Sequence, residues 1–219
     1  MARPAKKTPE QWKKEILNAA QSLFISKGYE ETSISDIMNM AGGAKGMFYH
    51  CFQSKEEVMH TLGNQLFFEN NPFESVKGRN DLNGLQKIKA LLVLNQSDEK
   101  RNKLNMEAVP ILKDPHILAA AIAENRRVLT PLWLELLEEG KKDGSIKTDY
   151  AKELSELLPL VNFWLMPSVF PANEEELRHK YGFVMEVLSH MGLPLLDDEI
   201  SAFTEKFISD ISEKGGNGS

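Results

Sequence analysis

The sequence predicts an all-α protein with a small N-terminal helical domain and a larger C-terminal helical domain. Apolar residues recur at spacings of three and four along most of the chain, which is the period of one helix face. No stretch shows convincing alternation of apolar and polar residues at period two, so no sheet is expected. Capping residues and glycines divide the periodic stretches into separate helices.

Three helices are expected in the first domain, placed at residues 8–65, and a fourth helix leads out of it. The first helix, 8–27, opens with a capping box at Thr8 and Gln11, and Gly28 is a typical stop. A second helix starts at Thr32 or Ser33 and is broken by two glycines. Further segments are expected at 44–50 and after Ser54-Lys55-Glu56-Glu57.

The second domain, placed at residues 66–213, is expected to be helical throughout. The boundary lies near the polar stretch 70–80, which holds Pro and Gly, and residues 214–219 are expected to form a disordered tail. The expected helices of this domain are 81–95, 98–109, 114–141, 149–169, 173–191 and 197–213.

Composition excludes several classes of protein. The chain has 219 residues, a net charge of −6 and one cysteine, Cys51, which cannot form an internal disulfide or a multi-thiolate metal site. No apolar run is long enough to span a membrane, and no signal peptide is recognisable, so a cytoplasmic protein without membrane contact is expected. The charge is uneven: residues 1–60 carry +1 and the remainder carries −7. This pattern is compatible with a nucleic-acid reader joined to an acidic body.

Residues 32–55 hold what a helix-turn-helix requires. Thr32 and Ser33 offer hydroxyls and backbone N–H groups at a helix start, where phosphates bind, and Gly42 permits a tight turn. The following short helix presents one positive charge and polar rings to a major groove, and its apolar residues plug a small core. The exposed set of that segment is Lys45, Met47, Tyr49 and His50, with Lys55 beside the next helix start.

The run from Ile16 to Val58 resembles the N-terminal domain of TetR-family repressors. The features that carry the resemblance occur in order over about 43 residues: Ala19-Ala20, Leu23-Phe24, Gly28, Thr32-Ser33, Ile37, Ala41-Gly42, Lys45-Gly46, Phe48-Tyr49, Phe52 and Ser54-Lys55-Glu56. The resemblance implies an all-helical regulator with a DNA-reading domain and a divergent body that holds an inducer pocket above a dimer interface.

The resemblance also implies roles for individual residues. Thr32, Lys45, Tyr49, His50 and Lys55 would contact phosphates and bases, Gly46 would allow close approach of the DNA backbone, and Met47 would face a base edge. Ser33 and Ala44 belong to the same expected DNA-binding set. The family usually has a β-branched residue where Gly43 stands and often Ser or Thr at positions 44 and 47. Gly43 is therefore expected to loosen the turn, and Ala44 and Met47 predict more apolar contact with bases.

Two apolar stripes suggest a homodimer. The stripes lie on the expected helices 149–169 and 173–191, and helical stripes pack either within one subunit or between two. The resemblance favours a four-helix interface between subunits. The residues expected there are Leu154, Leu158, Val161, Leu177, Tyr181, Val184, Leu188 and Met191.

A pocket for an apolar or amphipathic effector is expected where Pro131, Pro159 and Pro167 interrupt helices. Internal prolines kink helices and leave imperfect packing, although an aromatic cluster there also suits a plain core. The expected lining is His116, Asn125, Arg126, Trp133, Phe163, Trp164 and Met166. No metal site, cofactor motif or catalytic motif is recognisable, so no enzyme is expected.

These observations predict a homodimeric transcriptional repressor that binds a double-stranded DNA operator and is released by a small molecule. The alternative is a helical small-molecule-binding or adaptor protein that has lost operator binding, as the unusual residues Gly43, Ala44 and Met47 suggest. An all-helical enzyme remains a third, weaker hypothesis.

Overall fold

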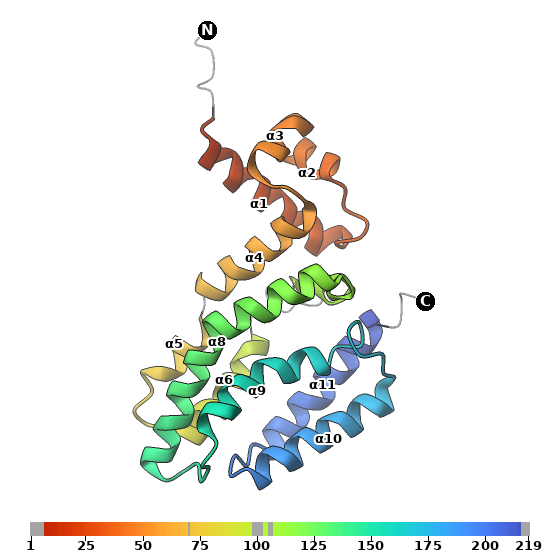
Figure 1. Ribbon diagram of the computed structural model, residues 1–219. Helices are drawn as coiled ribbons and strands as arrows, with labels where there is room; N and C mark the ends of the chain where they lie inside the picture. Colours follow the sequence, from red (N-terminus) through yellow and green to blue (C-terminus); the bar gives the residue numbers. More distant parts are fainter. Residues whose placement is uncertain (1–6, 70, 98–102, 105–106, 216–219) are drawn as a thin grey trace. The chain divides into compact units, whose positions relative to one another are not determined.

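The computed structural model in Figure 1 describes residues 7–69, 71–97, 103–104 and 107–215. Every regular element in these ranges is a helix, which confirms the predicted all-α fold with an N-terminal helix-turn-helix. The chain divides into two compact units. The head comprises Met1–Glu69 with Lys100–Ala108, and the body comprises Asn70–Glu99 with Val109–Ser219. The division follows residue 69 rather than residue 65, and the return of Lys100–Ala108 to the head has no counterpart in the sequence pattern.

The N-terminal part of the head is built by α1 (Pro9–Lys27), α2 (Ile34–Ala41), α3 (Lys45–Cys51) and α4 (Lys55–Glu69), and the described residues 103–104 and 107–108 of its second stretch are also helical. α1 and α2 begin at the expected capping boxes, because Thr8 and Ser33 each accept a hydrogen bond from the backbone three residues later. Their caps fix where each helix starts and therefore how long the connecting loops are.

Aromatic rings fill the core of the head. Phe24 of α1, Phe48 of α3 and Phe52 directly after α3 are each at most 2% exposed. The rings of Phe48 and Phe52 lie 6.0 Å apart, and Phe24 lies 5.1 Å from Tyr29. Burial of three large rings in so small a unit fixes α3 against α1, since each contributes about 2–3 kcal/mol of transfer free energy.

The body consists of α5 (Pro72–Lys77), α6 (Gly84–Ser97), a short 3₁₀ helix η1 (Val109–Lys113), α8 (Pro115–Asp143), α9 (Ala151–Trp164), α10 (Glu174–His190) and α11 (Asp198–Gly215). α5 lies where a polar boundary was expected. The expected helix 98–109 falls mostly outside the described residues, as does most of the expected tail.

α9 ends earlier than predicted, at Trp164 instead of residue 169. The chain then turns through Met166 and Phe170, both tied by backbone hydrogen bonds within the turn. Pro167 accounts for the difference, because a residue that precedes proline avoids helical backbone angles. By contrast, α8 continues through Pro131 and changes direction along its length in Figure 1.

Close backbone contact joins α6 to α8. A Cβ on Gly84 would lie 2.3 Å from the Gly140 Cα, so only glycine fits there. Beside this contact, the buried Lys87 ammonium donates to the Lys77 carbonyl at 3.0 Å and to Glu139 at 2.6 Å. These contacts hold α6 and α8 closely together within the body. Within the described residues, no helix is long and apolar enough to cross a membrane.

Candidate nucleic-acid interface

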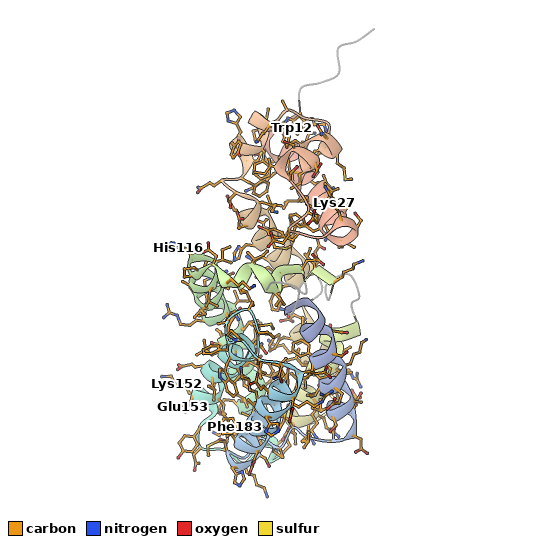
Figure 2. The ribbon with its side chains drawn as sticks, turned by 90° about the vertical axis from the view of Figure 1, so that its right-hand side faces the viewer. Trp12, Lys27, His116, Lys152, Glu153 and Phe183 are labelled. Carbon is orange, nitrogen blue, oxygen red and sulfur yellow. The ribbon has the colours of Figure 1, made fainter. Side chains whose placement is uncertain are left out.

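Two glycines with different roles form the turn between α2 and α3. Gly42 has a φ of +73° and ends α2 in the left-handed conformation. Gly43 instead lies against a neighbour: a Cβ there would sit 2.6 Å from the Trp12 ring and 2.7 Å from the Met38 methyl. The expectation that Gly43 loosens the turn is therefore wrong, because the Trp12 indole of α1 fills the space that a side chain would use. Figure 2 shows Trp12 in the head.

α3 presents one buried side and one open side. Phe48 is fully buried, whereas Tyr49 is 55% exposed and Lys45 and His50 are also exposed. Among the residues that the structure describes, no side chain pairs with the Lys45 ammonium. The open side therefore offers a cation, a phenol and an imidazole on one short helix, all available to a ligand.

The remaining residues predicted to bind DNA are Ala44, directly before α3, and Gly46 and Met47 within it. Ala44 caps the helix without a side-chain hydrogen bond and is exposed. Gly46 is exposed, and a Cβ on it would meet nothing within 4 Å. Met47 is half-buried. The free protein therefore does not require glycine at position 46, so a requirement for it would have to come from something that docks on α3.

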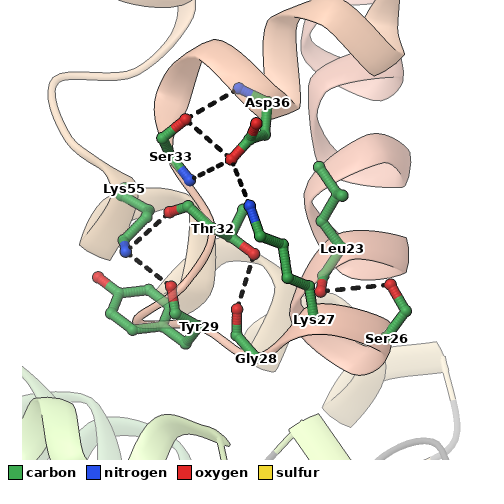
Figure 3. Close-up of polar contacts among 9 residues, drawn as sticks. All are labelled: Leu23, Ser26, Lys27, Gly28, Tyr29, Thr32, Ser33, Asp36 and Lys55. Atoms are coloured by element: carbon green, nitrogen blue, oxygen red, sulfur yellow. Dashed lines mark hydrogen bonds and ion pairs between the residues drawn. The ribbon is translucent and has the colours of Figure 1, made fainter.

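Thr32 and Lys55 do not belong to the open surface, which corrects their predicted role (Figure 3). Thr32 is 1% exposed, and its hydroxyl donates to the Gly28 carbonyl at 2.7 Å. The half-buried Lys55 ammonium donates to the carbonyls of Tyr29 at 2.7 Å and Thr32 at 3.0 Å. Both side chains are used to hold the loop between α1 and α2, because that loop has carbonyls that no helix satisfies.

Tyr29 is the centre of this loop. The Lys55 ammonium lies 4.0 Å from the Tyr29 ring centroid, and the Tyr29 hydroxyl donates to Glu56 at 3.0 Å. Burial raises the pKa of Tyr29, and the Glu56 carboxylate that accepts a hydrogen bond from its hydroxyl raises it further. Burial also lowers the pKa of Lys55, although nearby carboxylates oppose that shift. The sequence did not indicate Tyr29, since one aromatic after a helix stop has no distinguishing pattern.

Ser33 remains exposed, but its donors serve the helix cap. Its backbone N–H and its hydroxyl each donate to the Asp36 carboxylate at 2.9 Å. Lys27 pairs with the same carboxylate at 2.8 Å. The hydrogen bond from Lys27, followed by those from Ser33, lowers the pKa of Asp36 to about 2. The polar groups at the start of α2 are thus already paired with residues of the head, namely Ser33 with Asp36, and Asp36 with Lys27 of α1.

The residues predicted to line an effector pocket occupy different environments. Trp133 is buried in the body, edge-to-face with Phe73 at 5.3 Å, whereas Trp164 lies 6.0 Å from Phe183. His116, at the start of α8 in Figure 2, and Arg126 are exposed. Asn125, Phe163 and Met166 are half-buried. Trp133 therefore belongs to the interior of the body, and its role as pocket lining stays a prediction.

The predicted dimer stripes are mostly the core of a single body. Five of their residues are at most 9% exposed within one chain, so they cannot also face a second subunit: Leu154, Leu158, Leu177, Val184 and Leu188. Val161 and Tyr181 are half-buried, and Met191 is 38% exposed. The same helices also carry exposed apolar residues outside the expected interface set, namely Leu157 and Leu160 on α9 and Phe183 on α10. Phe183, labelled in Figure 2, is 60% exposed.

Comparison with known proteins adds independent information on the head. Residues 16–62 match the family described as bacterial regulatory proteins, tetR family. The match runs from within α1 into α4 and includes the whole of α3. The HTH-type transcriptional repressor KstR2 of Rhodococcus jostii is 29% identical over 151 residues, which cover 64% of this chain and 71% of that protein.

Solved structures share the fold of most of the chain, both head and body. FadR of Thermus thermophilus, described as a TetR-family transcriptional repressor in complex with lauroyl-CoA, is 22% identical with a TM-score of 0.56. The alignment covers 80% of this chain and 93% of FadR. A TetR/AcrR-family regulator from Thermobifida fusca is 21% identical with a TM-score of 0.53, and 94% and 97% of the two chains are covered. These likenesses concern the fold.

Proposed function

Because this chain is a DNA-binding transcriptional regulator of the TetR family, we propose that it is a homodimeric repressor that a small molecule releases from its operator. The open side of α3 carries this proposal: Lys45, Tyr49 and His50 are exposed above the buried Phe48. A lysine binds phosphate, and a helix N-terminus reads base edges in a major groove.

The experiment is a titration of the protein against labelled DNA from upstream of its own gene. A complex should form at nanomolar protein concentration, weaken steeply as salt rises, and fail to form on a scrambled sequence of equal length. The double variant Lys45→Ala, Tyr49→Ala should abolish it while the helical content of the protein is unchanged. Equal affinity for scrambled DNA would contradict the proposal.

Exposed apolar residues on α9 and α10 support the dimer. Leu157, Leu160 and Phe183 are 43–60% exposed, and large apolar side chains on two helices of one protein favour an interface. The proposed interface therefore uses the two helices that the sequence indicated but other residues on them. Two subunits would place two heads on successive turns of DNA, about 34–36 Å apart.

Uneven packing of α8 supports an effector site in the body. The first half of α8 carries half-buried apolar residues, such as Ile122 and Val128, whereas Leu136 and Leu137 in the second half are buried. A region that leaves apolar side chains incompletely covered suits an apolar or amphipathic ligand. FadR, which shares the fold, is described in complex with lauroyl-CoA, so an acyl-CoA is a rational first probe.

The effector test compares lauroyl-CoA with coenzyme A alone, each added to the preformed operator complex. Release by lauroyl-CoA only would show that an apolar chain is recognised, and it should be accompanied by a rise in the melting temperature of the DNA-free protein. The same comparison with other amphipathic compounds would extend the search, and a protein that no such compound stabilises would contradict the ligand part of the proposal.

A further inference from the structure

A carboxylate from a distant part of the sequence holds the loop between α1 and α2. The Tyr29 backbone N–H donates to Glu107 Oε2 at 2.9 Å. Gly28, whose φ is +95°, lies so close that a Cβ on it would be 3.4 Å from the same oxygen. Leu104, three residues before Glu107, is 1% exposed and belongs to the head. Leu104 and Glu107 therefore belong to the head although they follow α6 in the sequence: Leu104 is buried there, and Glu107 accepts a hydrogen bond from Tyr29.

Glu107 completes the set of contacts that fix Tyr29. The Tyr29 N–H is held by Glu107, its carbonyl by Lys55 and its hydroxyl by Glu56. Four residues later, Ser33 caps α2. Since α2 packs against α3, the position of Tyr29 helps to set where the open side of α3 points. A hydrogen bond to a charged acceptor is among the stronger ones in proteins, so its loss should be felt by the loop.

The same short stretch of chain is anchored in the body. Val109, two residues after Glu107, is 3% exposed and starts η1, which leads directly into α8. Leu104 and Val109 are five residues apart and can be separated by no more than about 17 Å of extended chain. Glu107 thus lies between a buried anchor of the head and a buried anchor of the body.

We infer that Glu107 is a positioning residue that transmits the state of the body to the DNA-reading head. When η1 and the start of α8 shift, the short connection to Val109 draws the Glu107 carboxylate away from the Tyr29 N–H and releases the loop before α2. This inference rests on the proposed function, because α8 is the helix that the effector site would use. It assigns a role to a residue outside both the open side of α3 and the proposed effector site.

The test reads hydrogen exchange at the Tyr29 amide of the free full-length protein by NMR. Glu107→Ala should raise the exchange rate at that amide about tenfold or more. Glu107→Gln keeps an acceptor oxygen and should restore most of the protection. Glu31→Ala removes a charge from the same loop without touching the Tyr29 N–H, so it should leave the rate unchanged. Equal rates in Glu107→Ala and the unmodified protein, or a Gln variant as labile as the Ala variant, would overturn the inference.

A second pair of variants tests whether Glu107 couples the body to the head or only stabilises the α1–α2 loop locally. Val109→Ala loosens the anchor in the body and should also raise exchange at Tyr29, by about threefold or more. Leu193→Ala creates a cavity elsewhere in the body, at a residue that is 0% exposed, and should not. If both variants leave Tyr29 protected, Glu107 is only a local brace and the inference fails.

Operator affinity provides the functional readout. Glu107→Ala should weaken the operator complex about tenfold, Glu107→Gln should recover it, and Glu31→Ala should leave the complex at least as tight as it was. Absence of any operator complex with the unmodified protein would refute the proposed function instead. The exchange experiments do not need DNA or effector, so the two failures can be told apart.

Discussion

Lys45 and Lys55 show how the same side chain serves two purposes within one small unit. Lys45 begins α3, is exposed and has no partner among the described residues. Lys55 begins α4 and donates to two carbonyls of the α1–α2 loop. Both lysines stand at positions that the family resemblance associates with DNA. Only their surroundings separate them, because the loop carbonyls reach Lys55 and not Lys45.

Methionine at these two positions should have opposite effects. Lys55→Met leaves the Tyr29 and Thr32 carbonyls without their donor and should lower the free energy of unfolding by about 1–2 kcal/mol. Lys45→Met should leave the unfolding free energy unchanged but reduce the salt dependence of operator binding by about one phosphate contact. Urea unfolding and DNA titrations at several salt concentrations test the pair. A stable Lys55→Met protein would show that water replaces the lysine.

Gly46 tests close approach of DNA to α3. Because a Cβ would meet nothing within 4 Å, Gly46→Ala should not destabilise the free protein. It should nevertheless weaken operator binding if a phosphate approaches the helix backbone there. Gly63→Ala is the matched control, since Gly63 also has open space and lies within α4. The control should gain about 0.5–1 kcal/mol of stability and keep its affinity for DNA.

Acid should weaken the start of α2 through Asp36. The pKa of Asp36 is about 2 in the folded protein, against an ordinary value of 3.8, so the folded state favours the ionised carboxylate. Its stabilising effect is complete above about pH 4 and is lost as the pH falls through about 2. Asp36→Asn should therefore be less stable than the unmodified protein at neutral pH, and the difference should shrink between pH 4 and 2. A constant difference over this range would contradict the assignment.

At the scale of elements, α1 does more than cover the core of the head. Its Trp12 indole packs on Gly43 and thereby closes the turn between α2 and α3. The family resemblance presents Gly43 as a departure, and the sequence alone offers no reason for it. Trp12 and Gly43 are 31 residues apart, so a local pattern cannot reveal that one fills the space left by the other. The packing accounts for one of the three departures, Gly43, that suggested a head without operator binding, and leaves Ala44 and Met47.

Substitutions at Gly43 and Trp12 should depend on each other. Gly43→Ala alone should cost about 1–3 kcal/mol of unfolding free energy, because its Cβ overlaps the indole. In a Trp12→Ala background the same change should cost at least about 0.5 kcal/mol less. A double-mutant cycle by urea unfolding measures this coupling. Additive effects would mean that the indole moves aside freely.

For the body, the sequence predicted which segments are helices more reliably than it predicted what each helix packs against. The amphipathic stripes correctly marked α9 and α10 as helices, since apolar spacing reports that one side is buried. The stripe itself does not say what buries it. The structure assigns Leu154, Leu158 and Leu188 to the interior of one chain, so a subunit interface on these helices has to use other residues.

At the scale of the whole molecule, the proposed dimer can be tested at Phe183, which is 60% exposed on α10. Phe183→Glu should yield a monomer with unchanged helical content, because a charge cannot be buried at an apolar interface without a partner. Leu196→Glu is the control: Leu196 is 61% exposed but lies between α10 and α11. Light scattering at several concentrations distinguishes the two, and the monomer should bind the operator far more weakly. Loss of the dimer in both variants would place the interface elsewhere.

The sequence by itself determined the helical class and the starts of the helices with clear caps, α1, α2, α8 and α10. These features depend on neighbours in the chain: caps act over three residues, apolar spacing over one or two turns, and Gly42 on its own backbone angle. The expectations that Phe48 is buried and Tyr49 is exposed on a short helix were also correct.

Tertiary structure alone decided which polar residues are available for recognition. Thr32 and Lys55 donate hydrogen bonds to backbone carbonyls of the α1–α2 loop. Glu107, which follows α6 in the sequence, accepts a hydrogen bond from the Tyr29 N–H of the same loop. Buried backbone groups must be satisfied by whatever side chains the fold brings near them, however distant these are in sequence. A pattern of neighbouring residues does not indicate which distant side chains meet this requirement. The pattern could therefore indicate α3 as the helix proposed to read DNA, but not the contacts that position it.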